Sequence, residues 1–147
     1  MRALLQRVSR ASVTVEGRKV GRIGPGLVIL LGVAHRDSSH DARLLAQKVA
    51  YLRIFPNQEG RLHFSLLDTG GQALIVSQFT LLADTHKGRR PSFTDAAPPD
   101  QAKVLYEQFV GVLGDIGVKV VTGHFQELMQ VELINDGPVT LLLDTQD

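Results

Sequence analysis

Leu27-Val28-Ile29-Leu30-Leu31-Gly32-Val33 is the stretch that decides the fold, because it is an unbroken apolar run of strand length. A run without polar alternation is typical of a strand that is buried on both faces. Gly24-Pro25-Gly26 breaks the chain directly before this run. A second apolar stretch, residues 74–82, predicts a second buried strand. Two such strands indicate a sheet that forms the centre of the molecule.

Further strands are expected on both sides of these buried runs. Residues 4–20 are typical of strand, turn and strand, because Ser12 and three β-branched residues at 13–15 are followed by Glu16-Gly17 and then by alternation over 19–23. The tail predicts strands at 118–122, 128–134 and 139–143. We expect Asn135-Asp136-Gly137-Pro138 to be the turn that joins the last two.

Two stretches have the apolar spacing of helices. The first begins at the candidate N-caps Ser38 and Ser39 and runs to about Ile54, where a proline follows. The second opens at Pro98-Pro99-Asp100 and ends near Gly114 and Gly117. We therefore predict one mixed α/β domain over residues 1–147, with strand-rich, barrel-like layers and two helices packed on one side. The predicted buried stripes are Ala42, Leu45, Ala46, Val49 and Leu52 in the first helix, and Val104, Leu105, Phe109, Val112 and Leu113 in the second.

The composition excludes several classes of protein. A chain of 147 residues with 44% hydrophobic residues is the size of one soluble domain. The absence of cysteine excludes disulfides, thiolate catalysis and cysteine-ligated zinc. The net charge of +1 excludes a globally basic nucleic-acid-binding protein. No apolar run reaches the roughly 18 residues of a membrane span, so we expect a cytoplasmic protein without a membrane partner.

Common catalytic motifs are missing as well. The five histidines show no metal-ligand spacing, and Ser77 is not framed by glycines as a nucleophile elbow is. No glycine-rich phosphate-binding loop is present. The sequence therefore predicts neither a metal nor a cofactor.

Two polar clusters adjoin apolar runs: Ser77-Gln78-Phe79-Thr80 follows the second buried run, and Asn135 to Thr140 precedes three leucines. Polar groups beside buried strands are costly unless they are satisfied. If the clusters meet in space, hydroxyls, backbone amides and Gly-Pro carbonyls would line a pocket suited to acyl transfer. The alternative is structural, with Ser77 and Thr80 as satisfied residues at a strand end and Gly137-Pro138 as a hairpin turn.

A basic loop follows the first cluster. Lys87, Arg89 and Arg90 place three positive charges within the polar segment 83–97, with no acidic residue until Asp95. This run is either a solvated loop or a loop that contacts phosphates, and long loops in compact domains are often functional.

The chain resembles the D-aminoacyl-tRNA deacylase family along essentially its whole length. The resemblance is carried by Arg2-Ala3-Leu4-Leu5-Gln6-Arg7-Val8, by Ser77-Gln78-Phe79-Thr80, by Lys87-Gly88-Arg89-Arg90-Pro91-Ser92-Phe93 and by Asn135-Asp136-Gly137-Pro138-Val139-Thr140. Each motif alone is short, but together and in this order they are specific to the family.

This resemblance implies hydrolysis of the ester that joins a D-amino acid, or glycine, to the 3′ end of a tRNA, with L-aminoacyl-tRNA spared. It implies a homodimer in which a cis Gly137-Pro138 enters the partner subunit's pocket and excludes L side chains. It also implies that Arg7 orients Gly137-Pro138, and that Met129, with Phe125 as a weaker candidate, contacts the terminal adenine.

The same resemblance implies that residues 77–80 hold the ester and its developing charge. Ser77 and Gln78 would position the ester or its ribose, and backbone N–H groups of Phe79 and Thr80 would face the oxyanion. Thr80 could also be a nucleophile, but no base accompanies it in either motif. The resemblance implies that a ribose hydroxyl of the tRNA assists instead, and we favour this alternative because no base is evident. In that case the basic loop would contact tRNA phosphates.

Two other functions remain compatible with these residues. The first is a non-catalytic module that captures the 3′ end of an RNA or a small amino-acid ligand. The second is a peptidase or esterase with a Thr or Ser nucleophile, which needs a base that the sequence does not display.

Overall fold

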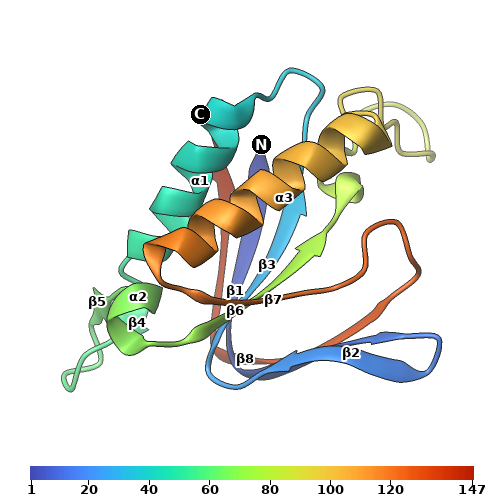
Figure 1. The fold of residues 1–147 in the computed structure, drawn as a ribbon. Coiled ribbons are helices and arrows are strands. Elements are labelled where there is room, and N and C mark those ends of the chain that lie inside the picture. The colour runs from blue at the N-terminus through green and yellow to red at the C-terminus, as the bar shows by residue number, and fades with distance from the viewer.

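Strand β1 (Arg2–Val15) organises the sheet, because it pairs along both of its edges in the computed structural model, which describes residues 1–147. On one edge its first half pairs antiparallel with β3 (Gly26–Gly32), and its second half pairs with β2 (Arg18–Ile23). On the other edge it pairs with β8 (Gln130–Asp144) over nearly its whole length. This long strand therefore connects three others into one curved sheet (Figure 1).

The rest of the sheet is parallel. Strand β6 (Gln72–Ser77) pairs with β3, and β7 (Lys119–Thr122) pairs with β6. The order is β2-β1-β3-β6-β7, with β8 beside β1. The sheet curls until Gly21 of β2 lies against Val121 of β7, which nearly closes it into a barrel. The predicted strand-rich, barrel-like α/β fold is confirmed.

Two long helices, α1 (Ser39–Tyr51) and α3 (Pro99–Ile116), cover one side of this sheet (Figure 1). Their inner faces and the sheet enclose the larger core, which includes Phe109, Leu27 and Ile29 at 0% exposure. A smaller apolar core lies inside the curved sheet, around Val13 and Val28. No helix has the length and apolarity that crossing a membrane requires. The elements that the sequence did not indicate are the short helix α2 (Leu66–Thr69) and the small hairpin of β4 (Phe55–Pro56) and β5 (Leu62–Phe64).

Two expectations about element ends are corrected. The run at 74–82 is a strand only to Ser77, after which Phe79–Leu82 form the 3₁₀ helix η1. Periodicity alone cannot separate a buried strand from a short buried helix, which explains the difference. The first helix ends at Tyr51, before Ile54. In the second helix Val104 is 53% exposed, so its expected place in the buried stripe is wrong, and Tyr106 is buried instead.

The expected hairpin turn at Asn135 to Pro138 is also wrong, because these residues lie within the single strand β8. Gln6 of β1 faces Thr140, and Val8 faces Asn135, so two steps along β1 correspond to five along β8. Residues 136–139 therefore bulge out of the pairing with β1, and we call this segment the excursion. A hairpin would reverse the chain, whereas both flanks of the excursion pair with the same strand in the same direction.

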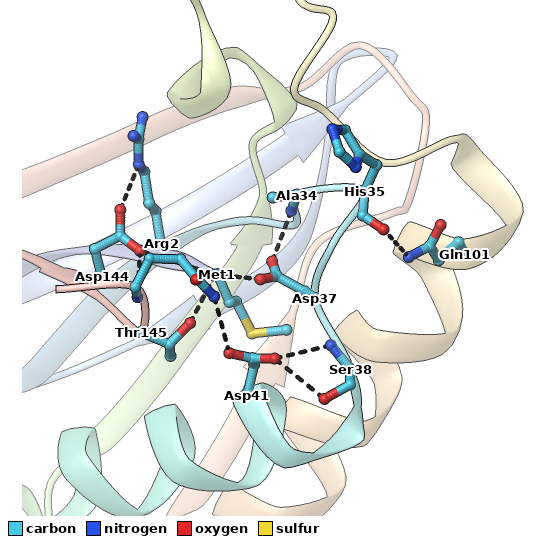
Figure 2. Close-up of polar contacts among 11 residues, drawn as sticks. Met1, Arg2, Ala34, His35, Asp37, Ser38, Asp41, Gln101, Asp144 and Thr145 are labelled. Atoms are coloured by element: carbon cyan, nitrogen blue, oxygen red, sulfur yellow. Dashed lines mark hydrogen bonds and ion pairs between the residues drawn. The ribbon is translucent and has the colours of Figure 1, made fainter.

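A polar cluster ties the ends of β1 and β8 to the loop after β3 (Figure 2). The α-amino group of Met1 donates to Asp37 Oδ1 at 2.7 Å and to Thr145 Oγ1 at 2.9 Å. Asp37 Oδ2 accepts from the N–H of Ala34 at 2.7 Å. Arg2 Nε donates to Asp144 Oδ2 at 2.8 Å. These charge-assisted bonds hold the ends of two neighbouring strands together at one end of the sheet.

Candidate functional site

The main cavity opens at the carboxyl end of β6, has a volume of about 680 Å³ and is mostly apolar. The carboxyl ends of parallel strands are a common place for ligand sites, because loops diverge there. Its walls come from the end of β6, from η1, from the first turn of α3 and the segment that leads into it, and from the start of β8 and the segment before it. The lining residues are Val76, Ser77, Gln78, Phe79, Phe93, Ala96, Ala97, Pro99, Ala102, Phe125, Gln126, Glu127, Leu128, Met129 and Val131.

Ser77, Gln78 and Phe79 are placed by a sharp change of direction between β6 and η1. The N–H of Gln78 donates to the carbonyl of Leu31 at 2.8 Å, which keeps the last β6 pairing before the chain turns. Gly32 allows this turn, because a Cβ there would lie 2.6 Å from Leu82 Cδ2 and 3.1 Å from the carbonyl oxygen of Gln78. Glycine at 32 therefore lets η1 lie directly on β3.

The backbone N–H groups of Phe79 and Thr80 belong to the first turn of η1. They stand at the start of η1, where the first amides of a helix have no partner inside it. Donors of this kind are suited to an oxygen that becomes negative during a reaction. Ser77 adds a hydroxyl and Gln78 an amide to the same end of the cavity.

Aromatic rings form two of the cavity walls. Phe79 and Phe93 meet edge to face, with ring centroids 5.0 Å apart. Phe125 leans on Tyr106, with ring centroids 5.8 Å apart. The Tyr106 hydroxyl donates to the carbonyl of Ile75 at 2.9 Å. Burial, with a smaller contribution from the Glu107 charge, raises the pKa of Tyr106 to about 12, so this hydroxyl is a fixed donor at neutral pH.

Only one ionisable side chain, Glu127, lines the cavity. Its Oε2 lies 2.9 Å from His124 Nδ1, so the carboxylate already has a partner. No histidine or lysine lines the cavity, and no group of three or more histidine, aspartate or glutamate side chains could hold a metal ion. The arrangement offers hydrogen-bond donors and apolar walls, and it offers Ser77 no basic partner.

Thr80 lies at the edge of this arrangement. Its side chain is exposed and is not among those that line the cavity. Its hydroxyl oxygen accepts a hydrogen bond from the side-chain amide of Gln78. The hydroxyl therefore has an amide for a neighbour and no base.

Arg7, Gly137 and Pro138 lie together, away from this cavity. The Arg7 side chain is buried beneath the excursion, where its Nε donates to the carbonyl of Asp136 and its guanidinium donates to the carbonyl of Ile54, both at 2.8 Å. Gly137 and Pro138 are exposed, and the peptide bond between them is cis. Gly137 has a φ of +148°, which L side chains rarely adopt.

The two polar clusters do not meet within one chain. Across the sheet, Ser77 of β6 pairs with Leu31 of β3, which pairs with Ala3 of β1, and Ala3 pairs with Leu143 of β8. The excursion instead lies opposite Arg7, further along β1. Three strand spacings separate them, roughly 14 Å, together with four residues along the strands, roughly 13 Å. Neither Gly137 nor Pro138 lines the cavity. The pocket that would contain both clusters is therefore absent from a single chain.

The basic loop begins at the cavity rim. The backbone N–H of Asp84 donates to the carbonyl of Ser92, and the N–H of Ser92 donates to the carbonyl of Asp84, both at 2.8 Å. This pair of bonds closes the segment between the two residues into a loop. Lys87, Arg89 and Arg90 are exposed in that segment and form no ion pair. Phe93, one residue after the closure, lines the cavity. Three unpaired cations thus lie a few residues from the cavity wall.

The structure brings Ser77, Gln78 and Phe79 together with Phe125 and Met129 in the lining of one cavity. Sequence reasoning did not single out Phe93 and Glu127 as lining residues. Phe93 closes the motif that begins at Lys87, and an aromatic residue at the end of a polar loop was the available signal. Nothing local marked Glu127, because its place depends on how the segment before β8 folds back.

Comparison with known proteins gives matches over nearly the whole chain. Residues 4–144 match the family model described as D-Tyr-tRNA(Tyr) deacylase. A protein of Roseiflexus sp. (strain RS-1), named D-aminoacyl-tRNA deacylase, is 61% identical over 145 residues, which cover 99% of this chain and 94% of that protein. A relative of the same name from Bacillus velezensis is 53% identical over 146 residues, which cover 99% of both chains. A solved structure titled c-Myc DNA Unwinding Element Binding Protein has a TM-score of 0.94 at 38% identity and covers 99% of both chains.

Proposed function

The chain belongs to the D-Tyr-tRNA(Tyr) deacylase family, and from this premise we propose that it hydrolyses the ester bond of D-aminoacyl-tRNA. The products would be free tRNA and a D-amino acid. We extend the proposal to glycyl-tRNA, because a substrate without a side chain meets no obstacle in a pocket that excludes L side chains. The protein would then act as a chiral proofreader of translation in the cytoplasm.

One observation carries the proposal. Ser77, Gln78 and Phe79 line an apolar cavity that has no histidine or lysine in its lining, and the N–H groups of Phe79 and Thr80 begin η1 at the same end of β6. Such a site can bind an ester and stabilise negative charge on its carbonyl oxygen. It offers no protein base, which favours a reaction in which the substrate provides one.

In this reaction water attacks the ester carbonyl carbon, and the carbonyl oxygen becomes an oxyanion that faces the N–H groups of Phe79 and Thr80. The bond between the carbonyl carbon and the ribose oxygen then breaks. The ribose oxygen leaves with one proton of the water, and the amino acid leaves as a carboxylate while the second proton passes to solvent. The neighbouring ribose hydroxyl of the tRNA would orient or activate the water, and Ser77 and Gln78 would hold the ester and ribose.

Selection against L-aminoacyl-tRNA is assigned to Gly137 and Pro138 of a second copy of the chain. Both residues are exposed and lie far from their own cavity. The outer edge of β8 has no pairing strand, and Val131, Ile134 and Leu142 of this strand are exposed. A long open edge with apolar side chains is suited to burial against another chain. In such a homodimer Arg7 would orient each excursion toward the partner subunit's pocket.

The remaining contacts are assigned by position. Met129 and Phe125 line the cavity and would contact the terminal adenine. Lys87, Arg89 and Arg90, exposed and unpaired beside Phe93, would contact tRNA phosphates. Such contacts position the RNA without reading its sequence.

Single-turnover release of amino acid tests the proposal, with D-tyrosyl-tRNA, glycyl-tRNA and L-tyrosyl-tRNA as substrates and purified protein in excess. We expect release from the first two and little from the third. Tight binding of D-tyrosyl-tRNA without release of amino acid would overturn the proposal that the protein is an enzyme. It would support a non-catalytic module that captures the 3′ end of the tRNA. Equal release from the D and L forms would overturn the proposed chiral selection, and the proposed hydrolase activity would stand.

A further inference from the structure

Asn135 stands where β8 leaves its pairing with β1, and its side chain makes three hydrogen bonds across the excursion. Its Oδ1 accepts from the backbone N–H of Val139 at 2.7 Å. Its Nδ2 donates to the carbonyl oxygen of Val139 at 3.2 Å and to Thr140 Oγ1 at 3.0 Å. One half-buried side chain thus connects the residue before the excursion to Val139, its last residue, and to Thr140, where β8 rejoins β1.

These bonds replace the pairing that Val139 has lost. Residues 136–139 have no partner in the register with β1. A side-chain amide carries the same donor and acceptor as a peptide group, so Asn135 can satisfy both the N–H and the carbonyl of Val139. The amide therefore sets the width of the gap between Asn135 and Val139.

Arg7 and Asn135 hold opposite ends of the excursion. Arg7 donates to the carbonyl of Asp136, at its beginning, and Asn135 binds Val139, at its end. Between these anchors remain only Gly137 and Pro138, to which no side chain of the protein donates a hydrogen bond. The position of this pair relative to β8 depends on both anchors, because moving either one moves the segment between them.

We propose that Asn135 is a positioning residue for the selection between D- and L-aminoacyl-tRNA. Its side chain sets how far Gly137 and Pro138 stand out from β8, and so how far they reach into the partner subunit's pocket. This inference rests on the proposed function and deepens it. A reach that is wrong by well under 1 Å should alter selection strongly, because exclusion by contact depends steeply on distance.

Replacement of Asn135 separates this role from plain stability. Asn135→Ala removes all three bonds, whereas Thr140→Val removes only the bond to the threonine hydroxyl. Asn135→Asp retains the acceptor for the Val139 N–H and places a second oxygen against the Val139 carbonyl. We expect the ratio of D- to L-tyrosyl-tRNA single-turnover rates to fall by about tenfold or more in Asn135→Ala, and by less in Thr140→Val.

Asn57→Ala is the matched control. The Asn57 side chain also closes a turn, since its Oδ1 accepts from the N–H groups of Glu59 and Arg61, both at 3.0 Å. That turn connects β4 to β5, and none of these three residues lines the cavity. This variant should lose comparable local bonds and keep the wild-type ratio of D to L rates.

The ratio of rates is the deciding quantity, because a loss of folded protein lowers both rates equally and leaves the ratio unchanged. A wild-type ratio in folded Asn135→Ala would overturn the inference, as would an equal change in Asn57→Ala. If Asn135→Ala does not fold, Asn135→Asp and Thr140→Val decide by the same measurement. Failure of the wild-type protein to hydrolyse D-tyrosyl-tRNA would instead overturn the proposed function, so the two failures are distinguishable.

Discussion

Replacing Gly137 with alanine would perturb the excursion directly. An alanine Cβ there would lie 2.8 Å from the backbone nitrogen of Val139, 2.9 Å from Val139 Cγ2 and 3.2 Å from the Arg7 guanidinium. Ordinary contacts begin near 3.4 Å, so the excursion would have to move by about 0.6 Å. The φ of +148° adds a backbone penalty of about 1–3 kcal/mol, because L side chains rarely adopt it.

Two consequences are expected. Together with overpacking of about 1–3 kcal/mol, the backbone penalty should lower the free energy of unfolding by about 2–6 kcal/mol. For a domain of this size, about 3 °C of thermal midpoint is lost per kcal/mol. A displacement of this size at the residues that exclude L side chains should reduce the ratio of D to L rates by about tenfold.

The assay is single-turnover release from D- and L-tyrosyl-tRNA, measured beside the thermal midpoint of the same preparation. Gly60→Ala is the control, since Gly60 also has a positive φ of +78° but has no atom within 4 Å of the new Cβ. This control should lose stability and keep selection. If Gly137→Ala loses stability but discriminates as sharply as the wild type, Gly137 does not exclude L substrates and the reasoning is refuted.

Three further predictions concern the site and its supports. Thr80→Ala should retain most single-turnover deacylation, because the hydroxyl is exposed, bonded to Gln78 and outside the cavity; a collapse of the rate with the fold intact would make it the nucleophile. Neutralising Lys87, Arg89 and Arg90 together should make the slope of log affinity for tRNA against log salt concentration shallower by about 2–3. An unchanged slope would mean that the loop is only solvated and contacts no phosphate. Burial alone raises the pKa of Asp144, but hydrogen bonds from Gln146 and Arg2, with nearby positive charge, outweigh it and lower that pKa. Asp144 therefore contributes stability above the unfolded-state pKa of about 3.9 that is lost as pH falls through the folded-state value. Chemical denaturation should show Asp144→Asn less stable than the wild type at pH 7, with the two converging in acid; a constant difference at every pH would contradict this.

The parts of the fold that follow from local pattern were predictable. The continuous apolar run at 27–33 is a buried strand, because no polar residue interrupts it, and Leu27, Val28 and Ile29 are fully buried. Helical spacing placed both long helices to within a few residues. Exposed Val104 shows the limit, because an apolar residue on a helix can lie beside the buried stripe without entering it.

Several residues of the candidate site could be named from the sequence, but their arrangement in space could not be predicted. Ser77 to Phe79 were marked by polar groups after a buried run, and they line the cavity with Phe125 and Met129. Phe93 and Glu127 reach the same cavity from segments whose paths depend on distant contacts. Sequence spacing carries no information about which loops converge on a strand end.

Local patterning therefore determined the strand and helix types of this chain and the identity of its two polar clusters. Only the tertiary structure decided that Asn135 to Pro138 belong to one long strand, and that they lie far from Ser77 within the same chain. The physical reason is that local signals describe the backbone of a few residues, whereas β8 pairs with β1, whose partner residues lie 116 to 142 positions away in the sequence. An Asn-Asp-Gly-Pro segment is equally suited to a turn and to a bulge, and pairing with β1 selects the bulge.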